Sequence, residues 1–194
     1  MNQLSIIFII TSILFNVHCK KESAKHSDFP KSETNPRLVE SKKTIEFRRT
    51  LNTELSGFKT LNEAVINMLD EVCIQKKNHS NLKSILSQKE KDFILYPNIY
   101  GSGTSLDVTP LEDYDKLIHS FENLAIQKLS NLKIKKSDFK SLKIFTKSVK
   151  PYGKANFHKV GLITLKTEGG EIEITEIKSV IELNGRFKVA IISP

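Results

Sequence analysis

Apolar and polar residues alternate along residues 171–192 and predict two β-strands at the end of the chain. The apolar positions of the first strand have even numbers up to Ile174 and odd numbers from Ile177 onward. Because side chains on a strand alternate between two faces, this change of phase near Glu176 predicts a β-bulge. A bulge bends its strand, so we expect the strand to curve around the upstream helices.

The two strands are separated by Asn184 and Gly185. Asn-Gly between alternating apolar segments is typical of a type I′ hairpin turn, whose two central residues both need positive φ. The sequence therefore predicts a tight hairpin here.

Apolar residues at intervals of three and four predict helices in the first half of the domain. One helix has a capping-box pattern at Thr60 and Glu63 and an apolar stripe that extends to Cys73. A shorter helical element begins with the same pattern at residues 87–90 and stops at Pro97. A third begins with Thr109 as its N-cap. Its predicted buried stripe consists of Tyr114, Leu117, Ile118, Phe121, Leu124 and Ala125.

Two further strands are predicted at residues 142–149 and 160–165, with a turn at residues 168–170 before the final hairpin. Helices followed by strands indicate the α+β class with an antiparallel sheet. We expect one domain, residues 47–194, with three N-terminal helices packed on a strongly bent antiparallel sheet of about four to six strands.

Residues 4–15 form an uncharged apolar segment that ends shortly before Cys19. The segment is too short for a bilayer span of about 20 residues and fits the apolar core of a secretory signal. The cysteine resembles the lipobox of bacterial lipoproteins, with departures at His18 and Asn16 and no Lys or Arg before the apolar segment. This resemblance implies a signal peptide at residues 1–18, acyl chains such as palmitate on Cys19, and lipid anchoring in the bacterial cell envelope. An ordinary secretory signal and an N-terminal membrane anchor are the alternatives.

Residues 19–46 are rich in Ser, Lys and Glu, contain two prolines, and show neither helical nor strand periodicity. Such a segment buries too little apolar surface to offset its conformational entropy. We predict a disordered tether between the membrane and the domain.

The chain has a net charge of +8, and residues 128–154 hold nine lysines against the single acid Asp138. A lysine-rich surface attracts anionic partners such as lipid headgroups or acidic glycans. The alternative is that lysines guard a sheet edge against aggregation. An exported location and the absence of arginine argue against nucleic acid. The candidate patch consists of Lys133, Lys135, Lys136, Lys140 and Lys143.

The order of three helices and a bent sheet closed by the hairpin at residues 183–189 resembles the nuclear transport factor 2-like superfamily. Residues 87–97 resemble a segment of its secreted bacterial members. The resemblance covers roughly residues 55–192 and implies a cone-shaped sheet around a pocket; a cystatin-like fold is the nearest alternative. The aromatic residues expected to line that pocket are Tyr96, Tyr100, Tyr114 and Phe145.

Local catalytic motifs are missing from the sequence. His79, His119 and His158 have no metal-binding spacing such as His-Glu-x-x-His, and Cys73 lies on an apolar helix stripe. We predict no cofactor, no metal site, and no His–carboxylate pair in a cavity. The predicted function is that of a non-catalytic binding or interaction module. The alternatives are a small-molecule enzyme that uses the cone cavity and a surface lipoprotein that binds anionic or protein partners through its lysines.

Overall fold

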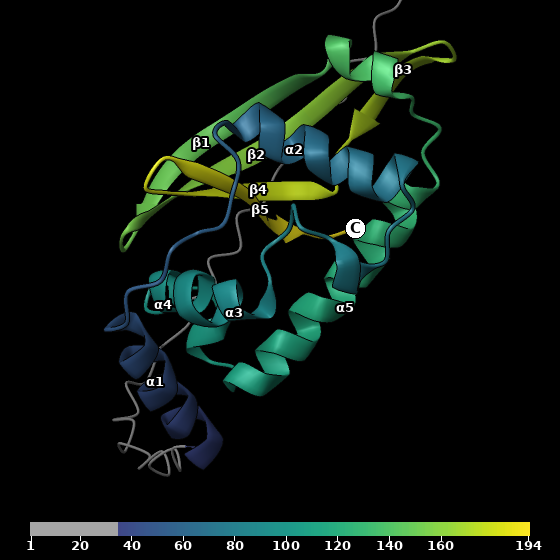
Figure 1. Ribbon diagram of the computed structural model, residues 1–194. Coiled ribbons are helices and arrows are strands. Elements are labelled where there is room, and N and C mark those ends of the chain that lie inside the picture. Colours follow the sequence, from purple (N-terminus) through teal and green to yellow (C-terminus); the bar gives the residue numbers. More distant parts are fainter. Residues whose placement is uncertain (1–34) are drawn as a thin grey trace, which may run out of the picture. The chain divides into compact units, whose positions relative to one another are not determined.

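The computed structural model describes residues 35–194, which form one α+β unit (Figure 1). The predicted signal peptide, Cys19 and the first part of the predicted tether lie outside the described residues. The helices come first and an antiparallel sheet follows, which confirms the predicted class. None of the described helices is long and apolar enough to cross a membrane.

The tether was predicted to extend to residue 46, but a helix, α1 (Pro36–Arg49), occupies its last part. The Asn35 side chain accepts a hydrogen bond from the Arg37 amide at 3.0 Å, and Pro36 occupies the first turn, where its missing N–H costs nothing. Only Ile45 is fully buried, and Arg48 pairs with Asp92 at 2.9 Å. A helix with so few apolar contacts shows no amphipathic pattern, which is why its sequence resembles a tether.

The next helix, α2 (Leu61–Leu69), continues into a π-helical segment, η1 (Asp70–Ile74). The Thr60 hydroxyl accepts from the Glu63 amide at 3.1 Å as predicted, but the Glu63 carboxylate accepts from the Lys59 amide. A short 3₁₀ segment, η2 (His79–Asn81), follows. The predicted second element is α3 (Gln88–Glu90), η3 (Lys91–Leu95) and α4 (Tyr96–Ile99), and its reciprocal capping box between Ser87 and Glu90 is confirmed. It does not stop at Pro97 as predicted, because Pro97 lies in the first turn of α4, where its missing N–H is tolerated.

After a short 3₁₀ segment, η4 (Ser105–Asp107), comes the longest helix, α5 (Leu111–Ser130). Its N-cap is Pro110, not Thr109, and no side chain caps it. The buried face also differs from the prediction: Leu117, Phe121 and Leu124 are 39–47% exposed. The residues that are buried are Tyr114, Ile118, Glu122, Ala125, Ile126 and Leu129. A carboxylate, Glu122, therefore occupies the centre of the buried stripe.

The sheet has five strands: β1 (Lys143–Tyr152), β2 (Ala155–Thr167), β3 (Gly170–Ile174), β4 (Ile177–Leu183) and β5 (Arg186–Ile192); a 3₁₀ segment, η5 (Lys136–Ser141), precedes it. The strand order is β1-β2-β4-β5, with β3 also paired to β2. The single strand predicted from residue 171 is thus two strands that pair with successive parts of β2 and are interrupted where the phase changes. The sheet is open.

Helices cover both faces of the strands at the centre of the sheet. Neighbouring residues Val180 and Ile181 belong to different core clusters, one with α2 and the C-terminal half of α5, the other with η3, α4 and the start of α5. Figure 1 shows α2 lying across the sheet, and α1, α3, α4 and most of α5 below the strands. The outer edge of β5 is covered by backbone hydrogen bonds with Phe58 and with Ser84 and Leu86, which removes one edge where another chain could pair.

The final hairpin gives the first testable prediction. Asn184 has φ +51° and Gly185 has φ +70°, which confirms the type I′ turn. A Cβ on Gly185 would meet no atom within 4 Å, so a side chain there is strained only through its backbone conformation. We expect Gly185→Val to lower the free energy of unfolding by about 1–3 kcal/mol, as measured by urea denaturation. The control is Gly169→Val in the β2–β3 turn, where φ is not positive and contacts are sparse; equal effects would contradict the explanation.

Candidate functional site

The four aromatic residues expected to line a cone pocket do not share a cavity. Tyr96 and Tyr114 are buried in the core, where their rings meet edge to face at 5.7 Å. Phe145 is 63% exposed on β1, and only Tyr100 lies at a pocket. The prediction that these four residues line one pocket is wrong, because helices pack against both faces of the central strands and leave no shared cavity there.

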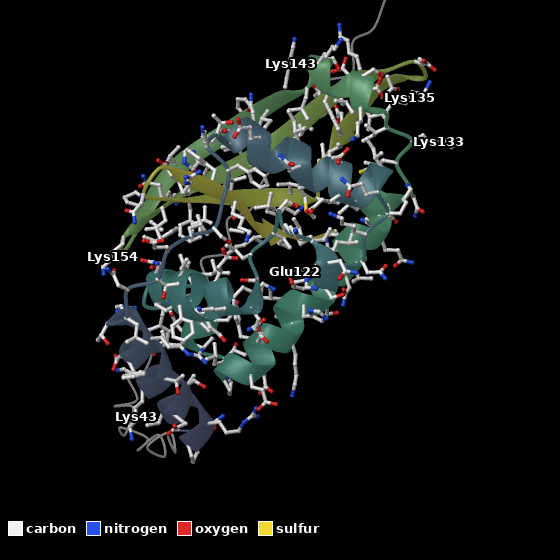
Figure 2. The ribbon with its side chains drawn as sticks, in the orientation of Figure 1. Lys43, Glu122, Lys133, Lys135, Lys143 and Lys154 are labelled. Carbon is white, nitrogen blue, oxygen red and sulfur yellow. The ribbon has the colours of Figure 1, made fainter. Side chains whose placement is uncertain are left out.

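The lysines of residues 128–154 do not form one surface. Figure 2 shows Lys133, Lys135 and Lys143 near one end of the sheet and Lys154 near the other. The five residues of the candidate patch lie in and around η5 and are exposed, but Lys135 pairs with Glu168 at 2.6 Å and Lys136 with Asp70 at 3.5 Å. Lys143 of the patch lies on β1 together with Lys147 and Lys150, and β1 has a strand partner on one side only. That position fits the edge-guard alternative.

A pocket of about 510 Å³ opens where four segments of the unit meet: the end of α1, the η3–α4 turn, and the turns of the β1–β2 and β4–β5 hairpins. We refer to it as the hairpin-end pocket. Its volume is within the range of about 300–1,000 Å³ that is usual for small-molecule sites. Buried Ile94 and Leu183 supply apolar surface, and Asn52, Asn98 and Ser102 supply polar groups.

Gly153 and Asn98 hold two of the segments that line the hairpin-end pocket in place. Gly153 turns the β1–β2 hairpin at φ +57°, and a Cβ there would lie 2.2 Å from the Asn98 Oδ1 atom. Only glycine allows this approach, in which Asn98 Oδ1 accepts from the Lys154 amide at 2.8 Å. The hairpin is thereby fixed against α4.

The charged side chains of the hairpin-end pocket are Arg49 and Lys154, and no carboxylate belongs to its described lining. Arg49 donates from Nε to the Pro97 carbonyl at 2.9 Å and from Nη2 to the Tyr100 carbonyl at 3.0 Å. These bonds orient the guanidinium and leave the Nη1 group for another acceptor. Neither Arg49 nor Lys154 forms an ion pair within residues 35–194. The pocket is therefore suited to an anion.

Three buried carboxylates were not found from the sequence. Glu71 accepts from the Ser84 hydroxyl at 2.6 Å, from two backbone amides and from Lys77. Glu90 accepts from Lys188 at 2.7 Å and from the amides and hydroxyls of Ser56 and Ser87. Both are fully partnered, as structural buried charges must be.

The third buried carboxylate, Glu122, is bonded differently. Its Oε2 atom receives both Lys91 Nζ, at 2.5 Å, and His79 Nε2, at 2.8 Å, while its Oε1 atom is buried and has no partner among the described residues. Its place at the centre of the apolar stripe, four residues after Ile118 and three before Ala125, is the sequence signal that could have identified it.

Histidine–carboxylate pairs do form, contrary to the expectation from sequence. His79 bonds Glu122, and His158 bonds Glu182 at 2.8 Å. His79 and His119, whose rings meet edge to face at 4.5 Å, also line a cavity. Distant segments supply the two members of each pair, so no local motif could reveal them.

Cys73 is buried, as its place on the apolar stripe predicts. It is 3% exposed, and its thiol donates to the Leu129 carbonyl at 3.2 Å. Burial raises the pKa of Cys73 to about 11, so the thiol stays protonated and unreactive near neutral pH.

Comparisons with known proteins find no relative: no family model matches the chain, and no curated protein or solved structure is significantly similar to it. The resemblances to bacterial lipoproteins and to the nuclear transport factor 2-like superfamily remain predictions.

Proposed function

We propose that this chain is a lipid-anchored binding module of the bacterial envelope that holds a small amphipathic anion in the hairpin-end pocket. The observation that carries the proposal is the pairing of two cations, Arg49 and Lys154, with apolar walls and with no described carboxylate in the lining. An ion pair or charge-assisted hydrogen bond to such cations contributes about 1.5–3 kcal/mol. Apolar contact with Ile94 and Leu183 adds to it.

The proposal is one of binding without catalysis. The described lining of the hairpin-end pocket contains no histidine, carboxylate or cysteine. General acid–base and covalent mechanisms most often use those side chains. The remaining polar groups are amides, hydroxyls and two cations, which can orient a ligand.

The anchor is supported by the sequence. Cys19 follows an apolar segment of secretory length and precedes Lys20 and Lys21, as a lipidated cysteine before a polar tether would. Residues 20–34 would then connect the membrane to the folded unit, whose first helix is α1. The anchor and the pocket have separate tests, and that of the anchor is given in the Discussion.

For the pocket, the expected result is that decanoate binds and decanol, which has the same chain length and no charge, binds at least about tenfold more weakly. Isothermal titration calorimetry of the purified chain measures both. Lys154→Gln removes one cation and keeps a side chain of similar length, so it should weaken decanoate binding by about tenfold and leave decanol unaffected.

The matched control is Lys133→Gln, which makes the same change far from the pocket near the other end of the sheet (Figure 2). It should leave decanoate binding unchanged. Equal affinity for decanoate and decanol, or equal loss in the two lysine variants, would contradict a specific anion site.

A further inference from the structure

Three side chains of types that bind metal ions meet between α5 and η2. His119 and Glu122 lie one turn apart on the same side of α5, and His79 reaches them from η2. One ligand atom from each lies within 4.8 Å of the others. The set of two imidazoles and one carboxylate is a donor set that proteins use for zinc and related divalent ions.

A second observation points to a missing cation or donor at this place. Glu122 is 0% exposed, and its Oε1 atom has no hydrogen-bond partner among the described residues. A buried acceptor without a partner destabilises the fold, and more so when it is charged. The two side chains that hydrogen-bond this carboxylate are Lys91 and His79, and both bond its other oxygen, Oε2. Figure 2 shows Glu122 on the inner side of α5.

The cluster is open to ligands from one side. His79 and His119 line a cavity of about 760 Å³, whose other walls include the neutral polar side chains Asn123 and Gln127. An ion could enter there and keep water on its outer side. Tetrahedral zinc with bonds near 2.0–2.1 Å places its ligand atoms about 3.3 Å apart. The three side chains would therefore have to adjust, and His79, if it ligates the ion through Nε2, would give up its hydrogen bond to Glu122 Oε2.

The lysines near the cluster, which would repel a metal cation, each have a partner of their own. Lys77 of the same cavity is paired with Glu71 at 2.9 Å, and Lys76 donates to the Ser130 carbonyl. Lys91, 2.5 Å from Glu122, is the cation closest to the carboxylate. It occupies Oε2 and leaves Oε1 to the incoming ion, so the carboxylate would bridge an ammonium and a metal.

We propose that His79, His119 and Glu122 form a binding site for a divalent transition-metal ion of the zinc class, with water completing its coordination. This site is separate from the hairpin-end pocket and does not depend on the function proposed for it.

The test is titration of the metal-free full chain with Zn²⁺ by calorimetry, with Co²⁺ absorption to report coordination by nitrogen and oxygen. One equivalent of Zn²⁺ should bind and raise the melting temperature. His119→Ala should weaken binding at least about tenfold, a typical cost of disturbing a metal site. His119 is exposed and forms no hydrogen bond within residues 35–194, so its loss should leave the fold intact. His79→Gln keeps an amide donor for Glu122, removes the ligating nitrogen, and should weaken binding similarly.

The control is His158→Ala, because His158 also bonds a carboxylate at 2.8 Å but has no second imidazole beside it in the described residues. It should leave Zn²⁺ affinity unchanged. The proposal is overturned if the wild-type chain binds no Zn²⁺, if His119→Ala and His79→Gln bind as well as wild type, or if His158→Ala weakens binding as much as they do.

Discussion

Replacing Glu90 with alanine is expected to destabilise the domain by about 3–5 kcal/mol, because the change leaves Lys188 charged and buried without its partner. Lys188 is 4% exposed, and the partners of its ammonium within residues 35–194 are Glu90, at 2.7 Å, and the Ser56 hydroxyl, at 3.2 Å. The change also removes the two hydrogen bonds that the Ser87 amide and hydroxyl donate to the Glu90 carboxylate, and leaves only the bond from the residue-90 amide to Ser87 Oγ in the capping box. Urea denaturation followed by circular dichroism measures the effect.

The two members of the pair should not be equivalent. Lys188→Met leaves Glu90 with four hydrogen bonds from Ser56 and Ser87, so the carboxylate stays partnered and the cost should be clearly smaller. Lys116→Ala, which breaks an exposed pair with Glu112, should cost at most about 1 kcal/mol. If Lys188→Met costs as much as Glu90→Ala, the ion pair alone, and not the serine network, holds the carboxylate.

The same carboxylate predicts the direction of the pH dependence. Burial would raise the pKa of Glu90, but the hydrogen bonds from Lys188, Ser56 and Ser87 together outweigh it and hold the pKa below its usual value. A folded-state pKa lower than the unfolded value of about 4.3 stabilises the fold above that pH. This stability is lost as the pH falls through the folded-state pKa. Glu90→Ala should therefore flatten the loss of stability below about pH 4.

The strands and their turns were predictable because they depend on local chemistry. Asn184-Gly185 requires positive φ at both positions, and the parity change at Glu176 marked the break between β3 and β4. The capping box at Ser87 and Glu90 was also read correctly, but its buried partner, Lys188, comes from a strand about a hundred residues later. Sequence separation of that size leaves no periodic signal.

The candidate sites were less predictable for the same reason. Glu122 was not included in the predicted buried stripe of α5, although a residue four after Ile118 and three before Ala125 lies on that stripe whatever its polarity. The hairpin-end pocket joins Arg49, at the end of a helix that was predicted as tether up to residue 46, with the turn of the final hairpin. Each of these sites assembles residues from segments far apart in the chain. The sequence alone therefore did not show which residues meet, and the structure was needed to bring them together.

The second large effect concerns Cys19, which lies outside the described residues. We expect Cys19→Ala to move the exported protein from the detergent phase to the aqueous phase of a Triton X-114 partition. Acyl chains contribute about 0.8 kcal/mol for each buried CH₂, so a multiply acylated cysteine anchors firmly, and its loss should release nearly all of the protein. In the wild-type chain the apolar segment before Cys19 would be removed with the signal peptide, so the acyl chains alone would hold the mature protein.

Cys73→Ala is the control, because its thiol is buried in the folded unit and should carry no lipid. It should remain in the detergent phase. Intact-mass analysis separates the alternatives for the wild-type chain: an acylated Cys19 at the mature N-terminus supports the anchor, and an unmodified thiol there indicates an ordinary secretory signal. A mature chain that keeps residues 1–18 and stays in the detergent phase after Cys19→Ala would instead indicate an N-terminal membrane anchor. Either of the last two results would overturn the lipid anchor and leave the anion pocket to be judged on its own test.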